Sequence, residues 1–213
     1  MTGAERPSLA GLPANMLVRG RRVVVVGGGR IAARKIDALV ELGAAVEVVA
    51  PAACDAVRAQ ADAGRVAWHK RTFTSGDLDG AWLAFTATGN DAVDNAVFAA
   101  GEASRIWVNS ADDPANCSFT LMSVIRRRDL VVAIGTGGRS PALAAQLRRQ
   151  LEEEIGPEYE TLLDILAEAR ESLRATGRSS EDADWQRAFD CGIVDLVRAG
   201  RVAEAKELLS RCL

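Results

Sequence analysis

Four valines followed by three glycines, in the run Val-Val-Val-Val-Gly-Gly-Gly-Arg-Ile-Ala at residues 23–32, constrain this chain more than any other feature. Consecutive β-branched residues are typical of a parallel strand that is buried on both faces. Gly27, Gly29 and Ala32 fit the Gly-x-Gly-x-x-Gly/Ala turn, in which backbone N–H groups face a pyrophosphate. Apolar residues then recur at helical spacing, at Ile36, Leu39 and Val40. A glycine turn between a strand and a helix predicts a dinucleotide site, and the alternative is a purely structural turn of an α/β domain without a ligand.

Composition limits the other classes of protein. A chain of 213 residues with 48% hydrophobic content suits one domain of ordinary size and a smaller one. Its net charge of −3 argues against a nucleic-acid partner, and the absence of any run of about 18 apolar residues argues against a membrane partner. Four cysteines without Cys-x-x-Cys spacing are typical of reduced thiols, so we expect a soluble, cytoplasmic protein. The single histidine, His69, predicts neither a multi-histidine metal site nor a Ser-His-Asp hydrolase, and we expect no protein-bound metal.

Strand and helix patterns alternate over the first half of the chain. Further strands are expected at Val46–Val49, Val66–His69, Trp82–Ala87 and Ile106–Asn109. This alternation predicts an α/β fold with a doubly wound parallel sheet of the Rossmann type, whose ligands bind at the carboxyl ends of the strands.

The pattern changes after Pro114. Two strand-like runs, Phe119–Ile125 and Leu130–Ile134, are joined by only four residues, which predicts an antiparallel β-hairpin because a helical crossover needs a longer connection. Ser140-Pro141 is a strong helix start. We expect helices from there to the end of the chain, at about 141–155, 158–175, 182–199 and 201–212.

Two clusters are candidates for chemistry at the ends of strands. The second strand ends in Val49-Ala50-Pro51 without the acidic residue that usually holds a ribose hydroxyl, and Arg30 could meet a 2′-phosphate, so the residues alone leave NAD and NADP open. Asp112 and Asp113 follow the fifth strand, where partial burial could make one of them a general acid or base. The alternative is a turn, since Asp-Pro is common in turns.

A third cluster precedes the helix at Pro141. Residues 135–140 offer backbone N–H groups, a threonine hydroxyl, Arg139 and a helix N-terminus, which together predict a local anion site. The alternative is a flexible connector with a capped helix. The arginines at 126–128 are either a solvated hairpin tip or a carboxylate-binding group.

Several motifs in one unbroken order resemble the precorrin-2 dehydrogenase, or siroheme synthase N-terminal, family in its stand-alone form. They are Val25–Lys35, Thr86-Ala87-Thr88, Asn109–Pro114 with Cys117-Ser118-Phe119, and Gly137–Pro141 with Ala144. The resemblance covers about residues 12–155.

The resemblance implies NAD-dependent oxidation of precorrin-2 to sirohydrochlorin, with NAD as the cofactor and a homodimer as the working form. An enzyme that also inserts ferrous iron, as a ferrochelatase, is the alternative, and a non-catalytic nucleotide-sensing domain is a weaker one. The implied parts are a Rossmann domain at 1–113, a hairpin dimerisation segment at 114–145 and a small helical domain at 146–213.

The resemblance also assigns site residues. Asp112 corresponds to the catalytic aspartate. The cofactor-binding positions are Gly27, Gly28, Gly29, Arg30, Ile31, Pro51, Ala52 and Thr88. The positions expected to bind the tetrapyrrole are Asn109, Thr136, Gly137, Gly138, Arg139 and Ser140.

Overall fold

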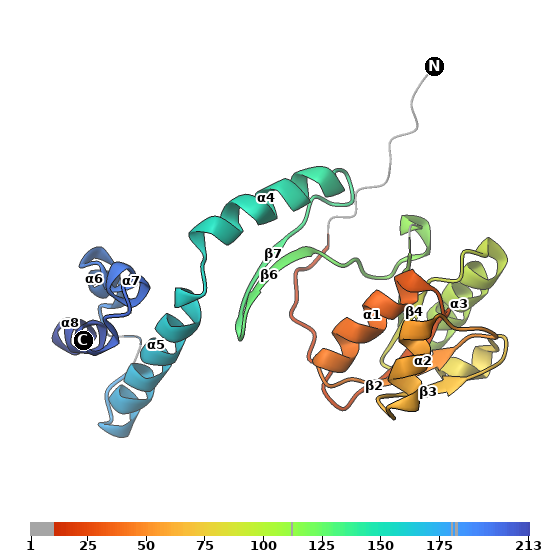
Figure 1. Ribbon diagram of the computed structural model, residues 1–213, viewed down its shortest axis with the longest axis horizontal. Coiled ribbons are helices and arrows are strands. Elements are labelled where there is room, and N and C mark those ends of the chain that lie inside the picture. The colour runs from red at the N-terminus through yellow and green to blue at the C-terminus, as the bar shows by residue number, and fades with distance from the viewer. Residues whose placement is uncertain (1–10, 112, 180, 182) are drawn as a thin grey trace, which may run out of the picture. The chain divides into compact units, whose positions relative to one another are not determined.

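The computed structural model describes residues 11–111, 113–179, 181 and 183–213 (Figure 1). These residues belong to two compact units, one that ends at Leu121 and one that comprises Met122–Leu213.

The first unit is built on a five-stranded parallel sheet in the order β3-β2-β1-β4-β5. This order places β1 between β2 and β4, as in one half of a doubly wound nucleotide-binding sheet, and confirms the predicted fold class. The strands are β1 (Arg22–Val26), β2 (Ala45–Val49), β3 (Val66–His69), β4 (Leu83–Thr86) and β5 (Trp107–Ser110).

Each face of the sheet is covered by its own helices. Because successive side chains of a strand point to opposite faces, Val23 and Val25 of β1 pack on one side while Val24 and Val26 pack on the other. The first side is covered by α1 (Arg30–Glu41) and α2 (Asp55–Asp62), and the second by α3 (Asp91–Ser104). All four valines are at most 2% exposed, which explains why the strand reads as an unbroken apolar run.

The chain after β5 differs from the prediction. Following the short 3₁₀ helix η2 (Pro114–Asn116), Cys117 forms an antiparallel bridge with Asn109, and Phe119 packs on the core of the first unit. The ring of Phe119 meets that of Phe85 edge-on, with the centroids 5.4 Å apart. The predicted strand at Phe119–Ile125 is therefore wrong at its start, because this aromatic contact holds Phe119 in the first unit.

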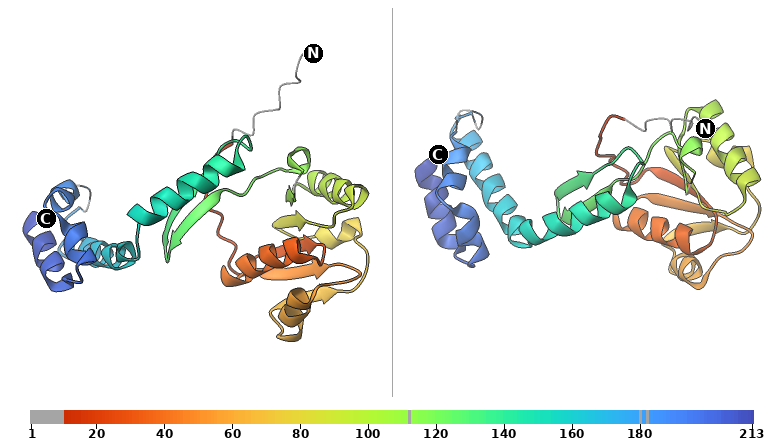
Figure 2. Two further views of the ribbon diagram at one scale, coloured as in Figure 1. Left: turned by 45° about the horizontal axis from the view of Figure 1, so that its top comes forward. Right: turned by 90° about the horizontal axis from the view of Figure 1, so that it is seen from above.

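The second unit contains the predicted hairpin, formed by β6 (Ser123–Arg127) and β7 (Leu130–Ile134), with α4 (Pro141–Glu154) beside it in both views of Figure 2. Four more helices follow: α5 (Glu158–Ala175), α6 (Trp185–Asp190), α7 (Ile193–Arg198) and α8 (Val202–Cys212). The single helix predicted at 182–199 is two helices, because Gly192 takes a left-handed conformation with φ of 84° between α6 and α7.

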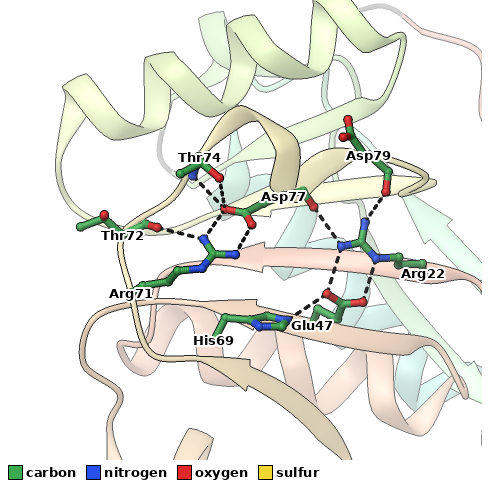
Figure 3. A network of polar contacts seen from close by, with 8 residues as sticks. All are labelled: Arg22, Glu47, His69, Arg71, Thr72, Thr74, Asp77 and Asp79. Carbon is green, nitrogen blue, oxygen red and sulfur yellow. Dashed lines mark hydrogen bonds and ion pairs between the residues drawn. The ribbon is translucent and has the colours of Figure 1, made fainter.

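A polar network ties the connection between β3 and β4 to one face of the sheet (Figure 3). Arg22 donates two hydrogen bonds to Glu47, of 2.8 and 3.0 Å, and also binds the backbone oxygens of Asp77 and Asp79. The carboxylate of Asp77 accepts from Arg71 and from the backbone N–H of Thr74, and it closes the capping box of the 3₁₀ helix η1 (Ser75–Leu78). Arg71 and these hydrogen bonds lower the pKa of Asp77 to about 2 against the desolvation caused by burial.

We expect this network to contribute to acid stability through Asp77. A carboxyl group whose pKa is lowered in the folded state stabilises the fold above its unfolded pKa, and this contribution is lost as the pH falls from about 4 to about 2. Asp77→Asn should therefore lower the free energy of unfolding at pH 7 by about 1 to 2 kcal/mol and flatten its fall below pH 4. Urea unfolding at several pH values measures both effects, with Asp62→Asn on exposed α2 as the control. Parallel pH profiles for Asp77→Asn and the unchanged protein would contradict this prediction.

Candidate functional site

The glycine loop after β1 makes two backbone approaches that no side chain would permit. A Cβ atom on Gly27, whose φ is 120°, would lie 2.4 Å from the carbonyl oxygen of Ala87. A Cβ on Gly28 would lie 2.2 Å from the carbonyl oxygen of Ala52, and the N–H of Cys54 donates to the Gly28 oxygen at 2.8 Å. These glycines therefore hold the carboxyl ends of β1, β2 and β4 together.

Gly29 differs from its two neighbours. A Cβ atom on Gly29 would meet nothing within 4 Å, so this residue borders open space. It is the N-cap of α1, and no side chain caps this helix end. The first turn of α1 carries no acidic residue, and Arg30 and Ile31 are exposed there. Backbone N–H groups and a helix dipole that face open space fit the pyrophosphate of a dinucleotide, which is the group that the sequence predicts here.

The loop after β2 forms a second border of this space. Pro51 and Ala52 are exposed, and the indole of Trp68 fixes the preceding turn by donating to the backbone oxygen of Ala50 at 3.0 Å. The structure thus brings the glycine loop and the loop after β2 together, as the predicted cofactor site requires.

A buried carboxylate that the sequence analysis missed supports the remaining predicted cofactor residue, Thr88. The Thr88 hydroxyl donates to Asp94 of α3 at 2.7 Å, and the Thr86 hydroxyl also donates to Asp94. Asp94 is only 7% exposed. Its position one helical turn after the cap residue Asn90 was a detectable signal, since an acid on the sheet-facing side of a helix needs polar partners.

Strand β5 ends in a second polar group. Asn109 is 6% exposed, and its Nδ2 donates to the backbone oxygen of Phe119 at 3.0 Å while its Oδ1 accepts from Lys35 of α1 at 2.9 Å. Asn109 is thus held by protein groups on both sides of its carboxamide. Lys35 is a second residue that the sequence analysis missed, because it lies 74 positions away in the chain.

Of the two carboxylates that follow β5, the structure describes only Asp113. Asp112 lies outside the described residues. Asp113 caps η2, since its carboxylate accepts from the backbone N–H of Ala115 at 3.1 Å and from the side chain of Asn116 at 2.7 Å. This geometry fits the turn interpretation for Asp113. Ser110, one strand position after Asn109, has a buried hydroxyl oxygen without a hydrogen-bond partner among the described residues.

The glycine-rich loop before α4 belongs to the second unit. Thr136 closes it, because its hydroxyl accepts from the N–H of Ser140 at 3.2 Å and its carbonyl accepts from the N–H of Arg139 at 3.1 Å. Gly137 and Gly138 have φ values of 58° and 72°, and Arg139 is exposed. The Ser140 side chain caps α4 by accepting from the N–H of Leu143 at 3.2 Å. The residues predicted to bind substrate in this loop are therefore adjacent, at the N-terminal end of α4.

Two of the arginines that the sequence offered as carboxylate ligands, Arg127 and Arg128, have partners within the second unit, and so does Arg148 on α4. Arg127 donates to the backbone oxygens of Glu152 and Ile155, near the end of α4. Arg128 pairs with Asp164 at 2.7 Å, and Arg148 pairs with Glu152 at 2.7 Å. These contacts indicate a structural role for the three side chains.

The described residues contain neither a cluster of metal ligands nor a membrane-spanning helix. No three His, Cys, Asp or Glu side chains among them gather as metal ligands would. Within the same residues, no helix is both long and apolar enough to span a bilayer.

Comparisons with known proteins agree with this arrangement. A family described as putative NAD(P)-binding matches residues 14–123, and one described as sirohaem biosynthesis protein central matches residues 127–154. Siroheme synthase of Photorhabdus laumondii subsp. laumondii is 34% identical over 204 residues, which are 95% of this chain and 43% of that protein. Siroheme synthase 1 of Pectobacterium atrosepticum is 37% identical over 204 residues, 95% of this chain and 42% of that protein. The chain thus spans less than half the length of these curated relatives.

A solved structure shares the fold. The structure of SirC, precorrin-2 dehydrogenase, matches with a TM-score of 0.70 and 24% sequence identity, over 95% of this chain and 98% of that chain.

Substitutions at Gly28 and Gly29 should have different consequences, because only Gly29 borders open space. Gly29→Val should leave the melting temperature within about 2 °C, since its Cβ enters open space, yet weaken NAD binding at least about tenfold by obstructing the pyrophosphate. Gly28→Ala should instead lower the melting temperature, because its Cβ collides with the backbone oxygen of Ala52. Calorimetry measures the affinity and thermal unfolding the stability. Full NAD affinity in Gly29→Val would show that the dinucleotide lies elsewhere.

Proposed function

Because this chain belongs to the siroheme synthase N-terminal family, we propose that it is an NAD-dependent dehydrogenase that oxidises precorrin-2 to sirohydrochlorin. The observation that carries the proposal is the open space at Gly29, beside the uncapped N-terminus of α1. This space is at the carboxyl end of the parallel sheet, the end at which β5 also finishes, two residues before Asp112 in the sequence. A dehydrogenation needs a hydride acceptor and a proton acceptor close together, and the carboxyl edge of this sheet supplies residues for both.

In this proposal, one set of residues binds NAD and another residue, Asp112, acts on the substrate. When bound, NAD supplies the nicotinamide that accepts the hydride. Gly27, Gly28 and Gly29 with Arg30 and Ile31 hold its pyrophosphate, Pro51 and Ala52 border its adenosine, and Thr88, oriented by Asp94, lines the next strand end. Asp112 takes the proton that the tetrapyrrole loses.

The loop before α4 has the chemistry to bind the substrate's carboxylates. Precorrin-2 is a polycarboxylate, and Arg139, which is exposed, can donate two parallel hydrogen bonds to one of them. The backbone N–H groups of Gly137 and Gly138 and the Thr136 hydroxyl supply further donors or polar contacts. Asn109, at the end of β5 in the first unit, is the remaining residue that we assign to the substrate.

The working protein in this proposal is a homodimer formed through the hairpin segment at 114–145. Apolar side chains of the second unit are exposed in this segment, Val124 by 43% and Leu143 by 50%, and just after it, where Leu147 is exposed by 37%. A two-stranded hairpin is marginal by itself and gains stability when a partner covers its apolar residues. Light scattering on the full chain should give the mass of a dimer, and a monomer with full activity would contradict this assignment. The four free thiols support a cytoplasmic location.

Asp112→Asn tests the proton acceptor. The amide keeps the shape of the side chain and removes its basicity, so anaerobic NADH formation with precorrin-2 should fall at least about a hundredfold. Asp113→Asn is the matched control, because its carboxylate caps η2, and a small change is expected. Near-normal turnover in Asp112→Asn would remove this role from Asp112. Assaying iron insertion into sirohydrochlorin in the same variants determines whether a chelatase reaction uses the same carboxylate.

Arg139→Ala tests the anion site. Loss of one carboxylate partner should weaken precorrin-2 binding about tenfold or more while NAD affinity stays unchanged. Arg149→Ala removes an exposed positive charge further along α4 and serves as the control. Fluorescence titration with the tetrapyrrole and calorimetry with NAD give the two affinities. Equal losses in both variants would indicate a general charge effect and would contradict a specific role for Arg139.

A further inference from the structure

A lysine ammonium lies at the carboxyl end of the sheet, between the cofactor helix and β5. Lys35 is in the second turn of α1, and its Nζ atom is 2.9 Å from Oδ1 of Asn109 and 5.1 Å from the centroid of the Phe85 ring on β4. A half-buried ammonium is costly unless polar or aromatic groups stabilise its charge. The contacts of Lys35 with an amide oxygen and a ring face fix a positive charge at this point.

The orientation of Asn109 follows from its second partner. Its Nδ2 donates to the backbone oxygen of Phe119, which only accepts hydrogen bonds. Exchanging the oxygen and nitrogen of the carboxamide would therefore set a donor against the ammonium and an acceptor against a carbonyl. Because Phe119 is itself packed on Phe85, Asn109 presents its oxygen to Lys35 from a rigid support.

The charge of Lys35 acts on the segment that follows β5. The thiol of Cys117 accepts from the N–H of Ser110 at 3.2 Å and lies 3.3 Å from the backbone oxygens of Ser110 and Asp113. Burial raises the pKa of Cys117, and the net shift is upward. The hydrogen bond from the backbone of Ser110 lowers this pKa, the charge of Asp113 raises it, and the charge of Lys35 lowers it. Among the described residues, the ionisable groups at this point include Lys35 from α1 and Asp113 and Cys117 from the segment after β5, while β4 contributes the neutral ring of Phe85.

We propose that Lys35 is a positioning residue of this site, whose fixed ammonium favours the ionised, proton-accepting form of the carboxylate that follows β5. The inference rests on the proposed dehydrogenase function and adds to it a residue that sets the charge state of the proton acceptor. Asn109 holds the ammonium in place, which gives this buried amide a purpose other than contact with substrate.

Lys35→Gln separates the charge from the hydrogen bond, because its amide can still donate to Asn109. The low-pH limb of the profile of NADH formation against pH should move upward by about one pH unit, as expected when an opposite charge near a carboxylate is removed. Lys35→Arg keeps the charge and should stay close to the unchanged protein. Arg34→Met removes a charge from an exposed neighbouring position of α1 and should leave the profile in place.

Cys117 gives a second measurement that requires neither substrate nor turnover. Iodoacetamide labelling of Cys117, followed by peptide mass spectrometry, reports the pH at which its thiol ionises. Lys35→Gln should shift this pH upward, and Arg34→Met should not. Lys35→Met, measured in the same way, provides a second neutral variant if the glutamine variant fails to fold.

The two assays distinguish this proposal from the function on which it rests. If the unchanged protein makes no NADH from precorrin-2, the dehydrogenase function is wrong, and the labelling of Cys117 still decides whether Lys35 supplies the field. If the unchanged protein is active but neither the rate profile nor the labelling profile moves in the neutral variants, the role of Lys35 is overturned. A moved labelling profile with an unmoved rate profile also overturns it, because the charge would then not act on the proton acceptor.

Discussion

The site depends on two backbone approaches that only glycine permits. Gly27 lies against the carbonyl of Ala87 and Gly28 against that of Ala52, at distances that would place a Cβ atom 2.4 and 2.2 Å from these oxygens. Through these contacts the ends of β1, β2 and β4 form one continuous edge. Gly29 is next in the chain, and a Cβ atom on it would enter open space. Gly27 and Gly28 therefore permit the tight turn, while Gly29 leaves room for a ligand.

Much of the fold could be predicted from the sequence because the decisive signals are local. The valine run identifies a strand buried on both faces, and the brief connection at 126–129 requires an antiparallel pair. Ser140 and Pro141 mark the start of a helix through capping chemistry that involves only neighbouring residues. Phe119 failed as part of a strand because its environment is an aromatic contact with Phe85, 34 positions earlier in the chain, and no local pattern encodes that contact.

The candidate site was predictable to a similar extent and for the same reason. The glycines and the loop at Pro51 and Ala52 follow a spacing that the backbone itself requires, and the structure brings them together. Asp94 left a local signal in its place one turn after Asn90, but the partners of Asp94 and of Lys35 lie on other elements, and no local pattern encodes those contacts. Asn109 shows how a partner can add to a local signal: its position at a strand end predicts a substrate contact, and its burial with partners at Lys35, Cys117 and Phe119 also gives it a structural role that the sequence did not indicate.

One helix connects the two halves of the proposed chemistry. The N-terminus of α1 faces the open space at Gly29, and Lys35 on the same helix reaches the end of β5. Lys35 lies six positions after Gly29 in the chain, a rise of roughly 9 Å along a rigid element. A displacement of this helix therefore moves the groups facing the pyrophosphate and the ammonium together. The chain has a net charge of −3, so positive potential for anions must be supplied locally. Helix α1 supplies it twice at the carboxyl end of the sheet, through its N-terminal dipole for the pyrophosphate and through Lys35 for the carboxylate that accepts the proton.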